Sequence, residues 1–442
     1  MATIMQLLYF LVVIVSLSCG SIPSPANEFV SDHGISGPLI ATLGLVSVWA
    51  ALCHLGSWLV ARQVVTEQLE PMVGARWIER QLEVFRWLSL FVIVLCLAGF
   101  GLAQAISVAP VLRDSMALQS IILLAPGLMM TFASWSAEQA YGVRLNYTEG
   151  GFRNHTRSLW LSFRSGLAWL VAPVLMLLGV SDLISLLPLS ENTASWITGA
   201  IVISFVVMGL PLLIRKLFKT TEISPGVNQW VVDLLVLAKI KSTKPMRWDT
   251  GGRAFNAMVA GFVPRFRSLL LSDRLLDELG REQIAMVVLH EAAHLRRRHV
   301  PLRMLAILPA WIAAVLVTQI AGDSHWALPL GSAAGILLTM LILRIVAYRS
   351  EYDADVQACK MAVEISSQLH GVPSTYEAAC DSLSSALMRV TFDHPAARKP
   401  TWLHPGVADR VAWMRRHRSE PMANSTVAGT IANPDQPCQL IN

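Results

Sequence analysis

Seven apolar runs, each long enough to cross a membrane as a helix, constrain the fold of this chain more than any other feature. A helix of about 20 residues spans a hydrocarbon core of roughly 30 Å and satisfies its own backbone hydrogen bonds there. The runs are residues 37–60, 87–111, 116–136, 166–187, 195–214, 301–321 and 326–347. Composition agrees, because 54% of the 442 residues are hydrophobic and 15% are charged, whereas soluble domains carry about 25% charged residues. We predict a mainly α, multi-span helical membrane protein.

A shorter apolar run, residues 4–19, is an eighth candidate span. No basic residue precedes it, whereas a secretory signal peptide needs a positively charged region before its apolar stretch. We therefore expect this run to remain in the protein as the first span.

The basic residues of the loops indicate the orientation of the spans, because Arg and Lys collect on the cytoplasmic side. Neither residue occurs in three of the connecting loops, 20–36, 188–194 and 321–325. Both are frequent in the other polar segments, 62–86, 137–165, 215–299 and the tail after 348. Eight alternating spans then place both termini and both large polar segments in the cytoplasm, and we expect a bacterial plasma membrane. Since the net charge of +5 comes from such loops, we predict contact with the lipid bilayer and no nucleic-acid binding.

Polarity divides the chain into five segments. They are a membrane domain of about six spans (1–214), a segment with an H-E-x-x-H motif (215–299), a two-span hairpin (300–347), a second polar segment (348–419) and a disordered tail (420–442). In the segment 215–299, the pattern predicts a helix over 227–240, strands over 245–250 and 264–271, and a helix from 281. The two polar segments would together form a small α+β domain.

The motif His290-Glu291-Ala292-Ala293-His294 carries the strongest chemical signal. Positions i and i+4 of a helix lie one turn apart on one face, so both imidazoles can bind one Zn²⁺ ion. Glu291 lies beside them, where a carboxylate can act as general base toward water. Because H-E-x-x-H also occurs by chance in unrelated helices, neighbouring features must support the site.

A zinc-peptidase site needs a third protein ligand and keeps its fourth position open. His299 would lie about 140° around a continuous helix from His294, so it should not reach the same ion. It could be a histidine at the membrane interface or one on the substrate side. The segment 350–355, Ser-Glu-Tyr-Asp-Ala-Asp, offers three carboxylates. Glu351 and Asp355 share a helical face, so one can bind the metal while the other orients a ligand histidine. Spacing alone does not decide which carboxylate binds.

The two-span hairpin explains how the motif and these carboxylates could meet. Such a hairpin returns the chain to the side that it left. We expect the second span to continue as one helix through Arg344 and Tyr348 to Glu351, next to the helix that carries His294.

Four motifs in this order resemble the integral-membrane zinc metallopeptidases that include the eukaryotic CAAX prenyl endopeptidase and the bacterial heat-shock membrane protease. They are Asn256 to Gly261 (N-A-x-x-x-G), His290 to His294 (H-E-x-x-H), Glu351 to Asp355 (E-x-x-A-D), and His404-Pro405 followed by Arg410. The resemblance covers about residues 250–412, and no motif before residue 215 aligns.

The resemblance implies a gluzincin-type zinc-peptidase domain with one Zn²⁺ ion per chain. It implies that His290, His294 and Glu351 are the metal ligands and that Glu291 is the base. Asp355 would orient a ligand histidine.

The resemblance also implies how substrate binds. The strand 265–271, with Arg265 and Ser268, would pair with an extended substrate backbone, and Asn256 would help to hold that backbone. His404 would approach the metal, where it would either stabilise the oxyanion or plug the idle site.

These features predict a membrane-embedded zinc endopeptidase that hydrolyses peptide bonds at the cytoplasmic membrane face. Its protein or peptide substrates would include damaged or misassembled membrane proteins, which is a role in quality control. The alternative is a signal transducer similar to the β-lactam sensors, which pair a membrane H-E-x-x-H with a later E-x-x-x-D and an extracytoplasmic sensor domain. The expected cytoplasmic tail contains no large soluble domain, which disfavours it. A scaffold with a vestigial site is disfavoured by the intact Glu291.

Overall fold

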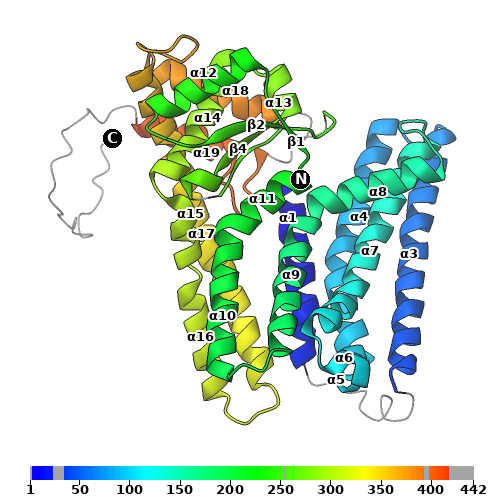
Figure 1. Ribbon diagram of the computed structural model, residues 1–442. Coiled ribbons are helices and arrows are strands. Elements are labelled where there is room, and N and C mark those ends of the chain that lie inside the picture. Colours follow the sequence, from blue (N-terminus) through cyan, green and yellow to red (C-terminus); the bar gives the residue numbers. More distant parts are fainter. Residues whose placement is uncertain (1, 23–33, 253–254, 262, 393–397, 418–442) are drawn as a thin grey trace, which may run out of the picture.

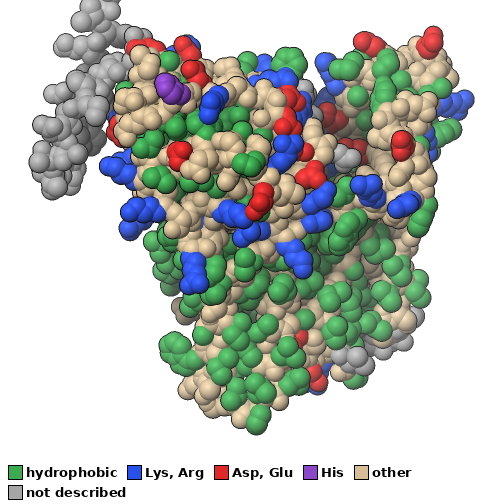
Figure 2. Space-filling model, turned by 45° about the horizontal axis from the view of Figure 1, so that its top comes forward, with side chains coloured by type: hydrophobic (Ala, Val, Ile, Leu, Met, Phe, Trp, Pro, Cys, Tyr) green, Lys and Arg blue, Asp and Glu red, His purple; other side chains and the backbone are tan. Residues whose placement is uncertain are grey.

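The computed structural model describes residues 2–22, 34–252, 255–261, 263–392 and 398–417, and shows a mainly helical chain with one small sheet. Long helices run side by side in the lower part of Figure 1, and the sheet with its covering helices lies above some of them. The lower surface is mostly hydrophobic on the face shown in Figure 2, as a surface in contact with lipid must be. The predicted disordered tail, 420–442, lies outside the described residues.

Among the described residues, seven helical segments are long and apolar enough to cross a membrane, which confirms the seven predicted spans. They are Ser36–Val65 (α3), Pro71–Gly99 (α4, Pro71–Val94, with a π-helical end), Met116–Arg144 (α7), Ala168–Ser185 (α9), Glu191–Leu217 (α10, Glu191–Ser204, continued through a π-helix by α11, Leu210–Leu217), His299–Ile320 (α15, His299–Leu305, and α16, Leu308–Ile320) and Ala327–Ile365 (α17). The first helix, α1 (Ala2–Ser18), is apolar over the shorter stretch Leu7–Ser18. It packs inside the bundle, where Val12 is 1% and Ser16 0% exposed.

The span that α4 forms, Pro71–Gly99, differs from the predicted 87–111. Its helix begins at Pro71, because the stretch up to Arg86 is amphipathic and buries Ile78 and Leu82 one turn apart. A charged amphipathic extension lowers the mean hydropathy and so hides the true start of the helix. The remaining helices of this half are α5 (Leu102–Val108), α6 (Pro110–Arg113) and α8 (Phe152–Gly166).

The spans place the large polar segments at one end of the molecule. In Figure 1 the connection between α3 and α4, helix α8 and the sheet lie at the upper end, whereas α5, α6 and the turn between α16 and α17 lie at the lower end. This is the arrangement that eight alternating crossings produce.

The first polar segment folds as a four-stranded sheet packed against helices. Its strands are β1 (Thr220–Thr221), β2 (Lys244–Trp248), β3 (Ala257–Ala260) and β4 (Ser268–Ser272), in the spatial order β1-β2-β4-β3. β4 runs parallel to β2 and antiparallel to β3. Helices α12 (Pro225–Leu237), α13 (Asp273–Glu278) and α14 (Arg281–Arg296) contact the sheet. Helix α18 (Tyr376–Val390) packs against α14 and α17, and α19 (Val407–Arg416) packs against α17 and α18.

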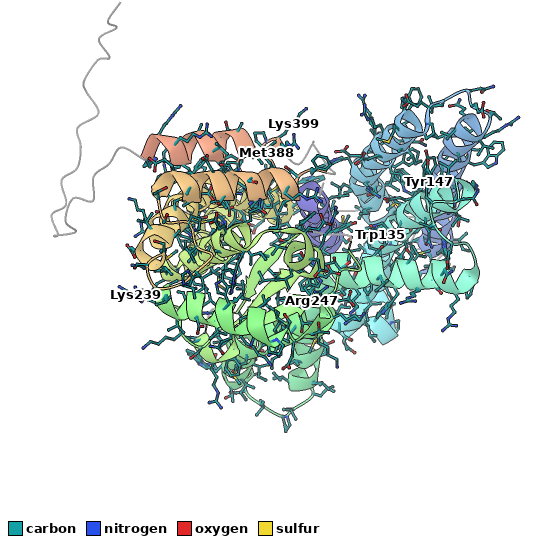
Figure 3. All side chains as sticks on the ribbon, turned by 90° about the horizontal axis from the view of Figure 1, so that it is seen from above. Trp135, Tyr147, Lys239, Arg247, Met388 and Lys399 are labelled. Carbon is teal, nitrogen blue, oxygen red and sulfur yellow. The ribbon has the colours of Figure 1, made fainter. Side chains whose placement is uncertain are left out.

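One apolar core joins the two polar segments into what we call the catalytic part, because the predicted H-E-x-x-H and E-x-x-A-D motifs both lie in it. Leu234 of α12, Leu269 of β4, Val288 of α14, Ala354 of α17 and Leu383 of α18 are all 2% exposed or less and belong to this core. Seen from above, the catalytic part lies beside the N-terminal bundle, with Arg247 on the former and Tyr147 on the latter (Figure 3). With 39 residues, α17 is about 58 Å long. It therefore begins among the spans and ends inside this core.

The expectation that strand 265–271 receives the substrate is wrong. Pro264–Phe266 forms a 3-10 turn, and the strand starts only at Ser268. β4 lies between β2 and β3, so both of its edges are already hydrogen-bonded, and Ser268 is 1% exposed. A further strand cannot add to it. The two edge strands of the sheet, as far as the structure describes it, are β1 and β3, and β3 is a strand of four residues that the sequence pattern did not predict.

Close packing between α16 and α17 fixes the hairpin that delivers Glu351, and glycine makes that packing possible. A Cβ atom at Gly331 would lie 2.0 Å from Thr318 Oγ1 and 2.7 Å from the backbone oxygen of Ala314. We expect Gly331→Ile to lower the free energy of unfolding by about 1–3 kcal/mol through overpacking. Gly44→Ile is the matched control, because nothing lies within 4 Å of a Cβ atom there. Equal unfolding temperatures for the two variants in detergent would contradict the prediction.

Candidate metal centre

Helix α14 carries the H-E-x-x-H motif and presents both histidines to one point. Gly280 begins the helix, and its backbone N–H donates to Gln283 Oε1 at 2.9 Å. Ile284, Val288 and Leu289 bury the opposite face in the core. The rings of His290 and His294 are 4.8 Å apart, with an interplanar angle of 87°, and their Nε2 atoms are 3.2 Å apart. The expected i, i+4 geometry is confirmed.

Helix α17 brings Glu351 to these two nitrogens. Glu351 Oε2 lies 3.6 Å from His290 Nε2, and Glu351 Oε1 lies 3.4 Å from His294 Nε2. One donor atom from each residue can be chosen so that all three lie within 4.8 Å of one another. Tetrahedral zinc ligands at 2.0–2.1 Å from the ion lie about 3.3–3.4 Å from each other. The separations therefore match a site for one such ion, and Glu351 is 3% exposed.

Asp355 lies behind the site and contacts the far side of the His290 ring. Its Oδ1 atom is 2.9 Å from His290 Nδ1, although the ring N–H is not well aligned for a hydrogen bond. Arg410 of α19 donates from Nε and from Nη2 to the two oxygens of Asp355, both at 2.7 Å. Asp355 is 0% and Arg410 8% exposed. The predicted orienting role of Asp355 thus has a neutralising partner that spacing did not reveal.

The two histidines of the motif differ in protonation because their neighbours differ. Burial disfavours the charged form of both, and it lowers the pKa of His294 to about 2. At His290 burial is outweighed by Asp355 and Glu351, which raise the pKa to about 9. A metal ion must therefore displace a proton from His290 but not from His294.

Glu291 shares the electrostatic environment of the centre. Burial raises its pKa to about 7, and the charges of His290, Glu351, Arg303 and Arg410 also act on it. The side chain is partly exposed. A carboxylate that titrates near neutrality is suited to accept and return a proton.

His299 contacts the far side of the His294 ring rather than the metal donors, because the helix breaks before it. Arg298 takes a left-handed conformation with φ 56° and ψ 36°, which ends α14 and starts α15 in a new direction. His299 Nδ1 then lies 2.9 Å from His294 Nδ1, and His299 Nε2 lies 3.1 Å from Asp353 Oδ2. His294 can thus donate from Nδ1 to His299, which donates from Nε2 to Asp353. This chain leaves His294 Nε2 with a free lone pair.

We expect His299→Ala to weaken zinc affinity by about 10–100-fold, because the orientation and tautomer of His294 lose their support. The measurement is competition for zinc with a chelator in detergent-purified protein. His325→Ala is the control, since that histidine lies in the turn between α16 and α17. Unchanged affinity in His299→Ala would show that His294 needs no such support.

The contacts of two arginines also escaped sequence analysis. Arg303 of α15 donates from Nη2 to Glu351 Oε1 at 3.1 Å and to Ser350 Oγ at 2.7 Å. Arg297 donates from Nε to Asp353 Oδ2 at 2.9 Å. Both arginines lie close to the helix break at Arg298, and the periodicity of the sequence does not predict that break.

His404 approaches the centre from the segment before α19. Its Nδ1 atom lies 3.2 Å from Glu351 Oε2, and its side chain is 45% exposed. The segment is held to α17 by Tyr348, whose hydroxyl donates to the Thr401 carbonyl at 2.6 Å, and by Trp402, whose Nε1 donates to the Met340 carbonyl at 3.2 Å. His404 is therefore placed beside the metal donors.

The structure separates the other predicted binding residues. Asn256 lies just before the edge strand β3, where its N–H donates to Ser272 Oγ at 3.0 Å. Arg265 lines a different cavity, together with residues of α11 and α12. Ser268 is buried inside the sheet.

Three comparisons relate this chain to known proteins. A sequence model described as peptidase family M48 matches residues 225–416. The fold is similar to the crystal structure of S. mikatae Ste24p, with a TM-score of 0.50 and 16% sequence identity, over 86% of this chain and 98% of that chain. At this identity the similarity concerns the fold. None of the curated proteins compared with the sequence matches it.

Proposed function

We propose that residues 225–416, which the peptidase family M48 model matches, form the catalytic domain of a multi-span membrane protein, and that this protein is a zinc-dependent endopeptidase acting at the cytoplasmic membrane face. The observation that carries the proposal is the set of donor separations among His290, His294 and Glu351. Two imidazoles and one carboxylate are the ligands of thermolysin-type zinc sites. When bound there, zinc would polarise the scissile carbonyl and make water more acidic.

The remaining residues of the centre handle protons and charge. Glu291 takes a proton from the attacking water and delivers it to the leaving amine. His404 lies beside Glu351 with an exposed face, so it can donate to the oxygen on which negative charge develops. Arg303 and Arg410 offset the charge of Glu351, which has 4% of its side chain exposed.

Substrate binding is assigned to the free edge of β3. An extended peptide can add to an exposed strand edge through main-chain hydrogen bonds, which accepts many side-chain sequences. β3 pairs on its other side with β4, from Ala257 opposite Leu271 to Ala260 opposite Ser268, and it contains the residues that follow Asn256. A sequence-tolerant site beside the membrane suits damaged or misassembled membrane proteins, and we propose quality control as the role.

The test uses full-length protein purified in detergent, with zinc content and casein cleavage as the two measurements. We expect about one zinc per chain, cleavage that stops on addition of a zinc chelator, and recovery when zinc is returned. Protein without zinc would overturn the proposal. Zinc without casein cleavage would favour the transducer alternative.

Orientation requires a separate test, for which a fluorescent protein can be fused after residue 417. Green fluorescent protein matures in the cytoplasm but not when exported through the general secretory route. Bright cells are therefore expected. Dark cells with intact fusion protein would place the catalytic part on the other face.

A further inference from the structure

A strongly basic cavity lies between the membrane spans and the catalytic part, away from the metal donors. One lobe, of about 370 Å³, lies between α11, α12 and the turn before β4, and its cationic residues are Arg215, Lys244, Arg265 and Arg267. The adjoining lobe, of about 410 Å³, shares Arg215 and adds Lys216 and Lys219. We call the two lobes the basic cavity. No carboxylate lines either lobe within the described part of the chain.

The positive charge of the basic cavity is only partly compensated. Lys244 pairs with Glu222 at 3.1 Å, and Lys219 pairs with Asp249. Arg215 has no acidic partner within 4 Å among the residues that the structure describes. The carbonyl oxygens at the C-terminal end of α11 carry partial negative charge, which could compensate these cations. The carbonyls of Lys216 and Leu217, however, already accept hydrogen bonds from the guanidinium of Arg164 on α8.

The inner wall of the basic cavity also offers polar groups that suit an anion. Thr243 lines it, and its buried hydroxyl has no hydrogen-bond partner among the described residues. Burial lowers the pKa of Arg267, because its guanidinium is partly removed from water. Hydroxyl and guanidinium groups together are typical ligands of phosphate oxygens.

The position of the basic cavity identifies the source of the anion. α11 is the last part of the span Glu191–Leu217, so Arg215 stands at the end of that span. Leu212, three residues earlier, lines the second lobe, which shares Arg215 with the first, and is 49% exposed, so the second lobe leads onto the apolar span surface. Figure 2 shows Lys and Arg side chains in a band just above the hydrophobic surface. A ligand with a phosphate and an acyl chain would use both features.

We propose that the basic cavity binds the headgroup of an anionic phospholipid from the leaflet next to the catalytic part. The phosphate would contact Arg215, Arg267 and Thr243, and an acyl chain would follow Leu212 along α11. This lipid would join the last N-terminal span to β2 and to the turn before β4. The proposal is independent of the metal and of peptide hydrolysis.

The test is native mass spectrometry of the full-length protein in mixed micelles with phosphatidylglycerol or with phosphatidylcholine. We expect phosphatidylglycerol to be retained in preference. Arg215→Gln combined with Arg267→Gln should lower its affinity by tenfold or more, roughly as expected for two cations near an anionic surface. Arg76→Gln combined with Arg80→Gln is the matched control, since it removes two exposed arginines from α4 near the same end of the spans. The control should bind as the wild type does.

Two further variants separate the effect of charge on lipid binding from an effect on folding. Arg215→Lys with Arg267→Lys keeps both charges and should keep most of the binding, and its melting temperature checks that the fold tolerates changes there. If the double glutamine variant does not fold, Lys216→Gln replaces it in the test, because Lys216 is at an exposed position. This single variant should lose less phosphatidylglycerol affinity than expected for the pair. Equal retention of both lipids by the wild type, or equal losses in the glutamine pair and the α4 control, would overturn the proposal. Displacement of phosphatidylglycerol by millimolar inorganic phosphate would assign the cavity to soluble phosphates instead.

Discussion

Glu291→Gln is expected to abolish casein cleavage while the purified protein keeps the metal content of the wild type. The amide cannot accept the proton of the attacking water, and a general base contributes about 10²–10⁴-fold to the rate. The ligand set His290, His294 and Glu351 stays intact, and glutamine has nearly the shape of glutamate. The measurements are zinc per chain and cleavage rate in one preparation.

A matched control for this substitution is Glu282→Gln on the same helix. Glu282 lies in the first turn of α14, and its Oε2 atom accepts a hydrogen bond from Ser382 at 3.2 Å. Its loss should leave cleavage within a fewfold of the wild type. Residual cleavage by Glu291→Gln at more than a tenth of the wild-type rate would mean that another group is the base.

Arg410→Leu is expected to lower the free energy of unfolding of the catalytic part more than the removal of any other single charge in the centre. The guanidinium neutralises Asp355, which is 0% exposed, through two hydrogen bonds, and it lies 3.7 Å from Glu351. Removing one partner of a buried pair leaves an uncompensated charge and costs about 3–5 kcal/mol. The free energy of unfolding in detergent, measured with the metal-free protein, is the readout.

Arg415→Leu is the control for Arg410→Leu, because it removes an arginine from the same helix. Arg415 pairs with Asp381 at 3.6 Å, and both side chains are mostly exposed, at 66% and 73%. Such a surface pair contributes about 1 kcal/mol or less. Arg410→Lys keeps the charge but not the bidentate geometry, so its effect should lie between the two. If Arg410→Leu matched Arg415→Leu, the buried pair would not be a main stabiliser of the catalytic part.

Much of the membrane part was predictable because its physics is local. A run such as 37–60 must form a helix in lipid, since no water is there to satisfy its backbone. The predictions of secondary structure were wrong or incomplete where the polarity of a segment does not reveal its conformation. The amphipathic start of α4 at Pro71 looked like a loop, and the four-residue strand β3 is too short for alternation to reveal.

Sheet order was not predictable from the residues of one strand. The sequence of β4 is compatible with an edge or a central position, and the resemblance favoured an edge that receives substrate. Pairing of Ser268 to Ser272 with both β2 and β3 decided the matter, because hydrogen bonds on both sides leave no group for a peptide. Strand order depends on contacts between distant segments, which local periodicity does not encode.

By itself, the sequence determined the membrane spans and the pairing of His290 with His294, because both follow from the geometry of a single helix. It also indicated that the carboxylates of residues 351–355 return to the side of the motif, since a two-span hairpin separates them, while the choice of Glu351 among them came from the family resemblance. Only the tertiary structure decided that His299 contacts His294. A continuous helix would carry His299 about 140° away, and the left-handed turn at Arg298 brings it back. That turn, like the contact of Arg410 with Asp355, depends on how separate helices pack.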